Sequence, residues 1–378
     1  MSVATKPSNI IIDARELRTS SGRYVERLIH YLQQLESDHQ FTILLKPGDM
    51  AGWSPTNPRF KKVACPHKEF TFSEQIGYLN QLNKIRTEYG DPGQTLVHFA
   101  FPQQPVLYKG KTVTTIHDLT TMRFINPDKQ ALMFKLKQRV YQYVVRRAVH
   151  KAKAVIAISE FTRDDLLDFA HIDPAKVTVT LEAADVINTP ASPLKGLQKK
   201  QFIMYVGRPT PHKNLERLIE AFALLRAQHP ELVLVLAGKK DANYQRIEAA
   251  TPERLRPYLY FTDFVSEGQL RWLYENCAAY VFPSLAEGFG LPGLEAMMHG
   301  APVVSSSATC LPEIYGEAAH YFDPLDVPAM ADAINEVLTD ENIRKTLVAT
   351  GHKQAAKYSW KRMAEQTLAV YNRALNED

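Results

Sequence analysis

Residues 202–222 read FIMYVGRPTPHKNLERLIEAF, and this stretch decides the fold. Its first six residues form the apolar run that a strand buried in a parallel sheet requires, and the run ends at Gly207. A loop with two prolines follows, and Asn214, a favoured N-cap residue, is expected to begin a helix. The apolar stripe of that helix is Leu215, Leu218, Ile219 and Phe222. A strand that leads through a loop into an amphipathic helix is the repeating unit of an α/β protein.

The same alternation runs through the rest of the chain in two series. The first series predicts strands at 9–12, 41–45, 96–101, 112–118, 154–159 and 177–182. The second predicts strands at 202–207, 232–238, 259–264, 278–284, 302–307 and 319–323. Amphipathic segments separate them, and the first of these carries apolar residues at helical spacing: Tyr24, Leu28, Tyr31, Leu32 and Leu35. Two similar α/β halves are therefore expected.

A change of composition marks the boundary between the halves. Residues 186–200 contain two prolines, a glycine and three lysines without periodicity, as an interdomain linker does. We therefore predict an N-terminal domain at 1–185, a C-terminal domain at 201–358, and a terminal helix at 359–378 that packs back toward the N-terminal domain.

The bulk composition is that of a globular protein of 378 residues, with 45% hydrophobic and 23% charged residues. No apolar stretch approaches the roughly 20 residues of a membrane span, and the first residues lack the apolar run of a signal peptide, so a cytoplasmic location is expected. Cys65, Cys277 and Cys310 are few and widely separated, which predicts neither disulfides nor a zinc site. The formal net charge of +4 is compatible with an anionic substrate or membrane surface and too mild to indicate nucleic acid.

Arg208 and Lys213 lie in the loop after the 202–207 strand, just before a helix. Ligands of open α/β sheets bind at the carboxyl ends of strands, and helix N-termini favour anions. Arg208 can fork two phosphate oxygens while Lys213 acts as a compact charge, so a diphosphate suits this place. The alternative is a pair of solvated loop cations.

Residues 284–299, SLAEGFGLPGLEAMMH, place two glutamates eight residues apart. Glu287 follows the 278–284 strand, and Gly288 and Gly290 permit a tight turn and close backbone approach to a ligand. The N–H groups around Phe289, Gly290 and Leu291 are then expected to converge at a helix start. Glu295 lies about one turn inside that helix, where its carboxylate suits a ribose diol, and Glu287 suits the hydroxyls of a sugar. The alternative is one exposed helix glutamate and one capping glutamate.

These two motifs carry a family resemblance. GRPTPHKN at 207–214, followed by SLAEGFGLPGLEAM at 284–297, resembles the E-x(7)-E retaining glycosyltransferases of family 4. Other segments resemble that family's landmarks in the expected order: SGRYV, TIHDL, AISEFTRDDLL, FTDFVSEGQLRWLYENCAAYVFPS and YSWKRMAEQTLAVY. The resemblance implies the GT-B fold, in which two Rossmann-like domains face each other across a cleft. It also implies that nucleotide binds mainly to the C-terminal domain, acceptor binds to the N-terminal domain, and no metal is required.

The resemblance also assigns residues. It makes Arg208 and Lys213 diphosphate ligands, Glu295 the ribose ligand and Glu287 a contact to the donor sugar. His117 matches the family's histidine near the donor sugar, whereas a lone histidine, taken without the resemblance, is more often a buried structural residue. Asp118 is expected to orient loop or backbone groups.

The acceptor half departs from the family pattern in one loop. The family often has two glycines after the first strand, whereas this chain has Ser20, Ser21 and Gly22, so only Gly22 matches. Its backbone is expected near the phosphate or the acceptor. The LEAAD stretch at 181–185 stands where relatives often have an acceptor loop, which makes Glu182 or Asp185 a candidate acceptor contact or an ordinary surface loop residue.

The expected activity is transfer of a sugar from a nucleoside diphosphate sugar to an acceptor hydroxyl, with retention, in polysaccharide or glycolipid synthesis. Catalytic roles are expected for His117, Glu287, Arg208 and Lys213, without metal or cofactor. A nucleotide-sugar epimerase, a phosphorylase, or a noncatalytic nucleotide-sugar-binding homologue remains an alternative. Residues 134–153 hold seven Lys and Arg residues and no acid, which favours either a solvated helix face or peripheral attachment to anionic lipid carrying a lipid-linked acceptor.

Overall fold

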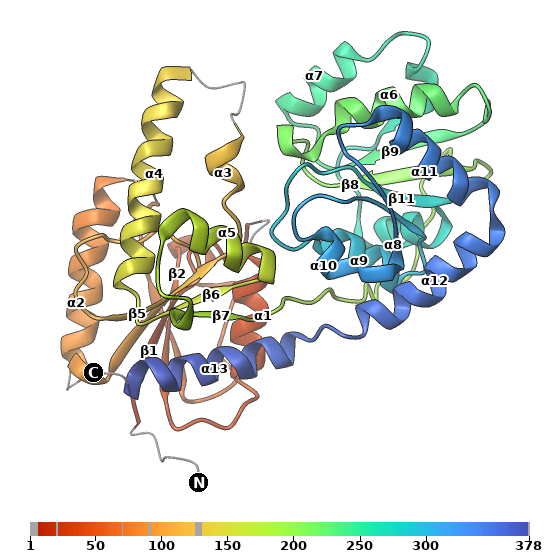
Figure 1. Cartoon of the computed structure of the whole chain (residues 1–378). Coiled ribbons are helices and arrows are strands. Elements are labelled where there is room, and N and C mark those ends of the chain that lie inside the picture. Colours follow the sequence, from red (N-terminus) through yellow and green to blue (C-terminus); the bar gives the residue numbers. More distant parts are fainter. Residues whose placement is uncertain (1–6, 20–21, 70, 90–91, 125–130, 377–378) are drawn as a thin grey trace. The chain divides into compact units, whose positions relative to one another are not determined.

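The computed structural model describes residues 7–19, 22–69, 71–89, 92–124 and 131–376, without the side chains of 131–135. The chain divides into two compact units, each with its own core (Figure 1). Unit 1 comprises Met1–Met122, Gln130–Glu182 and Ser359–Asp378, and unit 2 comprises Arg123–Lys129 and Ala183–Tyr358.

Unit 1 is built on a seven-stranded sheet in the order β3-β2-β1-β4-β5-β6-β7, in which every pairing is parallel. The strands are β1 (Asn9–Asp13), β2 (Gln40–Leu45), β3 (Phe60–Ala64), β4 (Thr95–Phe99), β5 (Lys111–Ile116), β6 (Ala154–Ala157) and β7 (Val177–Val179). The α-helices are α1 (Arg23–Leu32), α2 (Leu79–Glu88), α3 (Thr120–Arg123), α4 (Ala131–Lys151), α5 (Glu160–Ala170) and α13 (Trp360–Asn376). Single turns are η1 (Pro47–Asp49), η2 (Glu74–Tyr78), η3 (Pro92–Gln94) and η4 (Pro174–Lys176).

The terminal helix α13 belongs to unit 1. It packs beside α1 and against β4, β5 and β6. Its buried face includes Trp360, Met363 and Tyr371, and the Tyr371 hydroxyl lies 2.6 Å from Nδ1 of the fully buried His98 in β4. The last helix of the chain therefore completes the core of the first unit.

Unit 2 is built on a six-stranded parallel sheet in the order β10-β9-β8-β11-β12-β13. The strands are β8 (Phe202–Val206), β9 (Val233–Ala237), β10 (Leu259–Phe261), β11 (Ala279–Phe282), β12 (Val303–Ser306) and β13 (Ala319–Phe322). The α-helices are α6 (Leu215–Leu225), α7 (Ala242–Ala250), α8 (Glu267–Asn276), α9 (Leu291–Met298), α10 (Leu311–Tyr315), α11 (Val327–Thr339) and α12 (Glu341–Ala355). Single turns are η5 (Pro211–Lys213), η6 (Arg256–Tyr258) and η7 (Gly316–Ala318).

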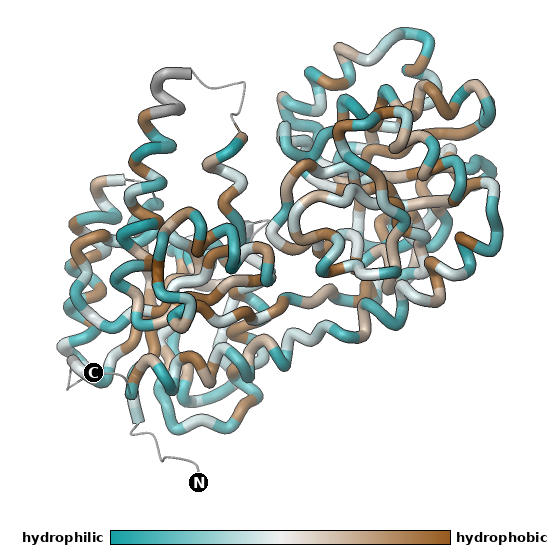
Figure 2. Tube along the Cα trace, in the orientation of Figure 1, coloured by the Kyte–Doolittle hydropathy of each residue, from teal (hydrophilic) through white to brown (hydrophobic). Residues whose placement is uncertain are grey.

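Strands β1 and β2 of unit 1 and β8, β9 and β11 of unit 2 are rich in buried apolar residues, and Figure 2 shows hydrophobic segments within both units. The prediction of an α/β protein with two parallel sheets is therefore confirmed. Part of the expected linker, 186–200, lies against unit 2: Ser192 N donates to Gly268 O at 2.9 Å, and the Thr189 hydroxyl donates to Glu267 at 2.7 Å. In the part of the chain that the structure describes, no helix combines the length and apolarity needed to cross a bilayer.

Strand order reverses once in each sheet, between β1 and β4 in unit 1 and between β8 and β11 in unit 2. The loops that leave two such neighbouring strands turn to opposite faces of the sheet, and the opening between them is where open α/β sheets bind ligands. Both motifs singled out in the second half lie at the reversal in unit 2. Arg208 and Lys213 follow β8, and Glu287 follows β11.

Candidate functional site

The loops after β8 and β11 are joined to each other by backbone and side-chain hydrogen bonds. Leu285 N donates to His212 O at 2.7 Å, which joins the two loops through their main chains. Asn214 Nδ2 donates to Pro283 O at 3.0 Å and to Pro324 O at 2.8 Å. This pairing of buried polar groups fixes the position of one loop relative to the other.

The prediction that a helix begins at Asn214 is confirmed, but the Asn214 side chain does not cap that helix. Asn214 occupies the N-cap position of α6, but its backbone is left-handed, with φ of 60° and ψ of 32°, and its side chain makes no capping hydrogen bond. Asparagine tolerates this conformation better than most residues. The side chain instead reaches the β11 loop, so its role is to connect loops.

Lys213 and Glu287 form an ion pair across the two loops. Lys213 Nζ lies 2.6 Å from Glu287 Oε1, and the two side chains are 19% and 12% exposed. Lys213 Nζ also lies 5.5 Å from the centroid of the Phe282 ring. The predicted diphosphate ligand and the predicted sugar ligand are therefore in direct contact, in a largely desolvated setting where charge interactions are strong.

Arg208, unlike Lys213, lies at the protein surface. Its side chain is 73% exposed and its Nε lies 3.2 Å from Oδ2 of Asp241, the N-cap residue of α7. An exposed ion pair of this kind contributes little to stability and can be exchanged for another anion at small cost. Arg208 is thus available to a ligand at the edge of the β8 loop.

The Glu287 loop is held from its other side by the segment after β12. Glu287 N donates to the Thr309 hydroxyl at 3.0 Å, and the Cys310 thiol donates to Glu287 O at 3.3 Å. Thr309 adopts a positive φ of 55°. Burial raises the pKa of the Cys310 thiol, so this thiol stays protonated. All three cysteines, Cys65, Cys277 and Cys310, are buried free thiols.

The glycine turn after Glu287 begins α9. Gly290 has a φ of 97°, and a Cβ there would lie 2.5 Å from the Tyr315 hydroxyl, which donates to Gly290 O at 2.6 Å. Gly288 is buried and Leu291 is half-buried as the first helical residue. The Phe289 side chain is buried edge-on against the Tyr358 ring at 5.6 Å, so it is the backbone of Phe289 that remains a candidate ligand contact.

Glu295 lies within α9 and is 7% exposed. The hydroxyl of Tyr274, in α8, donates to its Oε2 at 3.2 Å. A carboxylate can accept further hydrogen bonds beside this one, which leaves it suited to a diol. The sequence left two alternatives for Glu295, a ribose ligand and an exposed helix residue. Its burial excludes the exposed residue, and the ribose ligand stays a prediction.

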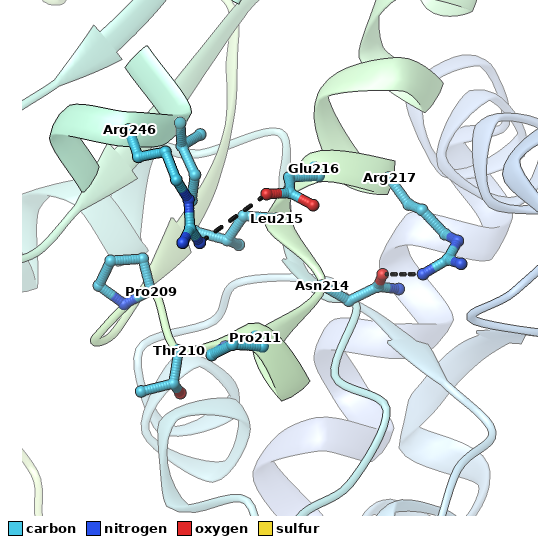
Figure 3. A pocket seen from close by; sticks show the side chains of 9 residues that line it. Pro209, Thr210, Pro211, Asn214, Leu215, Glu216, Arg217 and Arg246 are labelled. Carbon is cyan, nitrogen blue, oxygen red and sulfur yellow. Dashed lines mark hydrogen bonds and ion pairs between the residues drawn. The ribbon is translucent and has the colours of Figure 1, made fainter. Parts of the chain in front are cut away.

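A cavity of about 400 Å³ adjoins the β8 loop, between the start of α6 and α7 (Figure 3). Its lining includes Arg217 and Arg246, and neither Arg208 nor Lys213. Arg217 donates to Asn214 Oδ1 at 2.9 Å, and Arg246 lies 4.0 Å from Glu216 (Figure 3). Both arginines thus face protein acceptors, and the cavity is separate from the Lys213–Glu287 pair.

In unit 1, His117 follows β5 and makes contacts through both ring nitrogens. Nε2 lies 2.9 Å from Ala100 O, and Nδ1 lies 3.3 Å from Oε1 of Glu182, which is 4% exposed. Glu182 was considered as an acceptor contact or a surface residue, and the surface interpretation is wrong. It is buried against His117, because the chain after β7 passes the carboxyl end of the sheet.

Asp118 and Gly22 complete the sequence candidates of unit 1. Asp118 Oδ1 accepts from Thr120 N at 2.7 Å, which confirms its expected role in orienting a loop. Gly22 is the N-cap residue of α1, and a Cβ there would lie 2.1 Å from Glu16 O, so close backbone packing requires glycine. Ser20 and Ser21 lie outside the described residues. Gly22 has a right-handed φ of −72°, which any residue can adopt, so the need for glycine here comes from this close packing, and its approach to phosphate or acceptor stays a prediction.

Sequence reasoning missed the partners of the candidate residues. Asp241, Tyr274, Thr309 and the pairing of Glu182 with His117 were not expected as site contacts. Each follows the carboxyl end of a parallel strand or packs on α9. The order of the strands could have indicated these contacts, because the carboxyl ends of parallel strands lie at the same edge of the sheet.

Comparison with protein families matches both halves of the chain. Residues 21–186 match the model described as Glycosyltransferase Family 4, and residues 192–354 match the model described as Glycosyl transferases group 1. These two matches together cover most of the chain and meet at the boundary between the two sheets.

Similar proteins point the same way. The chain is 33% identical to an Escherichia coli O-antigen chain mannosyltransferase B over 69% of this chain and 70% of that protein. It is 32% identical to the E. coli serotype-specific mannosyltransferase WbdA over 70% of this chain but 34% of that longer protein. Among solved structures, a sucrose-phosphate synthase from Thermosynechococcus elongatus superposes with a TM-score of 0.75 and 20% identity, covering 96% of this chain and 98% of that chain. With two Rossmann-like domains and these matches, the chain has the GT-B fold and belongs to the family 4 glycosyltransferases.

Proposed function

We propose that this glycosyltransferase moves mannose from a nucleoside diphosphate mannose to an acceptor hydroxyl, with retention of anomeric configuration, during synthesis of a surface polysaccharide. The observation that carries the proposal is the Lys213–Glu287 ion pair of 2.6 Å, which joins the two loops at the strand-order reversal of unit 2. The sugar and the pathway are proposed from the names of the two mannosyltransferase relatives, of which one acts on an O-antigen chain.

The ion pair supports this chemistry because each partner suits one part of the donor. Bond cleavage places negative charge on the departing diphosphate, and a fixed cation in a dry site lowers the energy of that charge. When donor binds, Lys213 turns its charge to the diphosphate and Glu287 accepts hydrogen bonds from sugar hydroxyls. Arg208, released from Asp241, adds a two-pronged contact to the phosphates. Glu295 holds the ribose.

The anomeric configuration is retained because the diphosphate leaves from, and the acceptor hydroxyl attacks, the same face of the sugar. The diphosphate leaves, and its oxygen accepts the proton of the incoming acceptor hydroxyl, so no enzymic nucleophile is needed. Alignment of the two substrates and exclusion of water supply the remaining rate enhancement.

A donor screen tests the proposal. The protein is incubated with a panel of nucleoside diphosphate sugars, with and without extracted polysaccharide acceptors, and release of nucleoside diphosphate and shift of Tm are measured. We expect one mannosyl donor to raise Tm and to release nucleoside diphosphate only when acceptor is present. An epimerised donor without acceptor, or consumption of inorganic phosphate, would favour an epimerase or a phosphorylase instead.

Metal removal gives a second prediction. Two cations already serve the proposed phosphate site, and within the described residues no group of three or more His, Cys, Asp or Glu side chains is placed to hold a metal ion. We expect transfer in excess EDTA to stay within about twofold of the untreated rate, since no Mg²⁺ has to neutralise the diphosphate. Loss of transfer in EDTA, restored by Mg²⁺ or Mn²⁺, would contradict this prediction.

Helix α4 supports peripheral attachment of unit 1 to anionic lipid. Leu136, Val140 and Tyr143 are 57%, 55% and 60% exposed and recur at four- and three-residue spacing, so they form one apolar stripe on the helix. Exposed basic residues accompany the stripe: Lys137, Arg139, Arg146, Arg147, His150 and Lys151. An apolar stripe beside basic residues is the pattern of helices that lie in a membrane interface.

Vesicle cosedimentation tests this attachment. We expect binding to phosphatidylglycerol-containing vesicles at low salt, with little binding to phosphatidylcholine vesicles, because each basic residue contributes on the order of 1 kcal/mol near an anionic surface. High salt and the double substitution Val140→Ser/Tyr143→Ser should each reduce the bound fraction. The matched control is Leu224→Ser, which removes a 49% exposed leucine from α6 of unit 2. Equal binding by both variants, or none to either vesicle, would favour a soluble acceptor.

A further inference from the structure

Both ring nitrogens of His117 face oxygen atoms that accept hydrogen bonds. Nε2 lies 2.9 Å from the main-chain carbonyl oxygen of Ala100, and Nδ1 lies 3.3 Å from Oε1 of Glu182. The carbonyl oxygen of Ala100 can only accept, so Nε2 carries a proton. Nδ1 faces the Glu182 carboxylate as an ion pair, and a second proton on Nδ1 makes this contact a charge-assisted one. The two contacts therefore favour the doubly protonated ring, the imidazolium.

The ring is also fixed by its neighbours. Phe101 stacks on it with a centroid distance of 4.8 Å and an interplanar angle of 23°, and Tyr24 meets it edge-on at 4.8 Å and 85°. The Tyr24 hydroxyl in turn lies 3.0 Å from the Thr115 hydroxyl, so Tyr24 has a partner of its own. Two aromatic contacts, one hydrogen bond and one ion pair therefore hold the His117 ring in place.

We propose that Glu182 is a positioning residue for the transfer reaction, which holds His117 as a correctly oriented imidazolium at the carboxyl end of β5. The inference rests on the proposed function and on the expectation, from the family resemblance, that His117 lies near the donor sugar. Glu182 does not touch substrate. Its carboxylate accepts from Nδ1–H of His117, and so keeps the second proton and the positive charge on the imidazole ring where a neutral histidine would otherwise stand.

The charged and titratable groups around His117 agree with this state. Burial lowers the pKa of His117, but the hydrogen bond to Glu182 and the charge of Glu182 raise it, with further help from Ala100 O and Asp118, and the net direction is upward. His98 opposes it from β4, but burial lowers the pKa of His98 to about 3, so His98 stays neutral. Burial likewise raises the pKa of Tyr24, which therefore stays protonated.

The sign of the pH dependence follows. A histidine whose pKa is raised in the folded protein keeps its proton at a pH where a free histidine, with a pKa of about 6.5, has lost most of it. The stability that the pair contributes is fully present below that value and is lost as the pH rises through the raised pKa. Transfer that depends on the imidazolium should decline over the same basic range.

The direct test is an NMR titration of the His117 ring nitrogens in the full-length protein. The His117→Gln variant identifies the signals by their absence, and the unaltered protein, Glu182→Gln and Glu182→Asp are compared across the pH range. We expect both nitrogens of the unaltered protein to be protonated at neutral pH and the midpoint to fall in Glu182→Gln, which keeps the shape but removes the charge. Glu182→Asp should lie between them. Glu160→Gln, which removes an exposed acid from α5, should leave the midpoint unchanged.

Kinetics decide whether the held proton matters for transfer. We expect kcat of Glu182→Gln to fall about tenfold at pH 8 and to recover toward that of the unaltered protein as the pH is lowered, because the variant's histidine regains its proton only at a lower pH. An unchanged NMR midpoint in Glu182→Gln would overturn the proposal, and so would a rate loss that is equal at all pH values. Absence of transfer by the unaltered protein would count against the proposed function alone, since the titration still tests the hold of Glu182 on His117. If Glu182→Gln does not fold, the NMR midpoint and the pH dependence of kcat are compared between Glu182→Asp and the unaltered protein instead.

Discussion

Replacing Lys213 by alanine is expected to lower kcat for transfer by about 10²- to 10³-fold, the loss typical of removing one fixed charge-stabilising group from a dry site. The cation is needed most when the diphosphate departs, so kcat and kcat/KM should fall together. The free energy of unfolding should fall by only about 1–2 kcal/mol, because the loop stays joined to the β11 loop through Leu285 and Asn214. Steady-state kinetics and urea unfolding of the same preparation check both halves of this prediction.

The double variant Lys213→Ala/Glu287→Gln separates catalysis from ion-pair stability. Lys213→Ala alone leaves the 12% exposed Glu287 carboxylate without its nearest cation, and Glu287→Gln relieves this. We expect the double variant to recover stability but no activity, with effects on kcat that are less than additive because the two residues touch. Arg208→Lys should be impaired as well, since a point charge does not replace a forked contact. The catalytic role of Lys213 would be contradicted if Lys213→Ala lowered the free energy of unfolding by more than it raised the activation free energy of transfer.

Glu295→Ala is expected to weaken binding of free nucleoside diphosphate by about 10- to 100-fold, the range for a lost hydrogen bond to a charged group. Glu287→Ala should leave this affinity within about threefold and act on turnover instead, because it contacts the sugar in the proposed arrangement. Calorimetry with the nucleoside diphosphate, followed by kinetics with the donor, distinguishes the two effects.

Tyr274→Phe is the matched control for Glu295. It removes one hydrogen bond to Oε2 and leaves the carboxylate in place, so its effect on nucleotide affinity should be smaller than that of Glu295→Ala. Loss of nucleotide affinity in Glu287→Ala, with affinity retained in Glu295→Ala, would mean that the two roles are reversed.

The sheets could be predicted from the sequence because buried parallel strands are nearly continuous in apolar residues. All six strands of unit 2 fall within predicted runs, but β3 (Phe60–Ala64) of unit 1 was missed. Its sequence, FKKVA, carries two lysines, and it pairs only with β2 at the sheet edge, where one side of the strand is left to solvent. Edge strands of this kind lack the apolar pattern on which the prediction depends.

The site could be predicted only as far as residue type and local position allow. Lys213 and Glu287 were each identified from their own motif, yet they are 74 residues apart, and only the order β8-β11 puts their loops side by side. The contact of Glu182 with His117 could not be predicted, because the two residues are far apart in the sequence and follow β7 and β5, which lie on either side of β6. Asn214 was correctly placed at the start of α6, but the sequence did not show that its backbone is left-handed. A side-chain cap usually requires an extended N-cap backbone, and the Asn214 side chain instead bonds to carbonyl groups of other loops.

The most direct test of glycosyl transfer with retention is an NMR experiment with a ¹³C-labelled nucleoside diphosphate mannose. Protein, donor and acceptor are mixed in excess EDTA, and the anomeric signals of donor and product are followed together with released nucleoside diphosphate. We predict one nucleoside diphosphate for each new glycosidic bond and the same anomeric configuration in donor and product. A product of inverted configuration, or nucleoside diphosphate released to give free mannose whether or not acceptor is present, would contradict the proposed function.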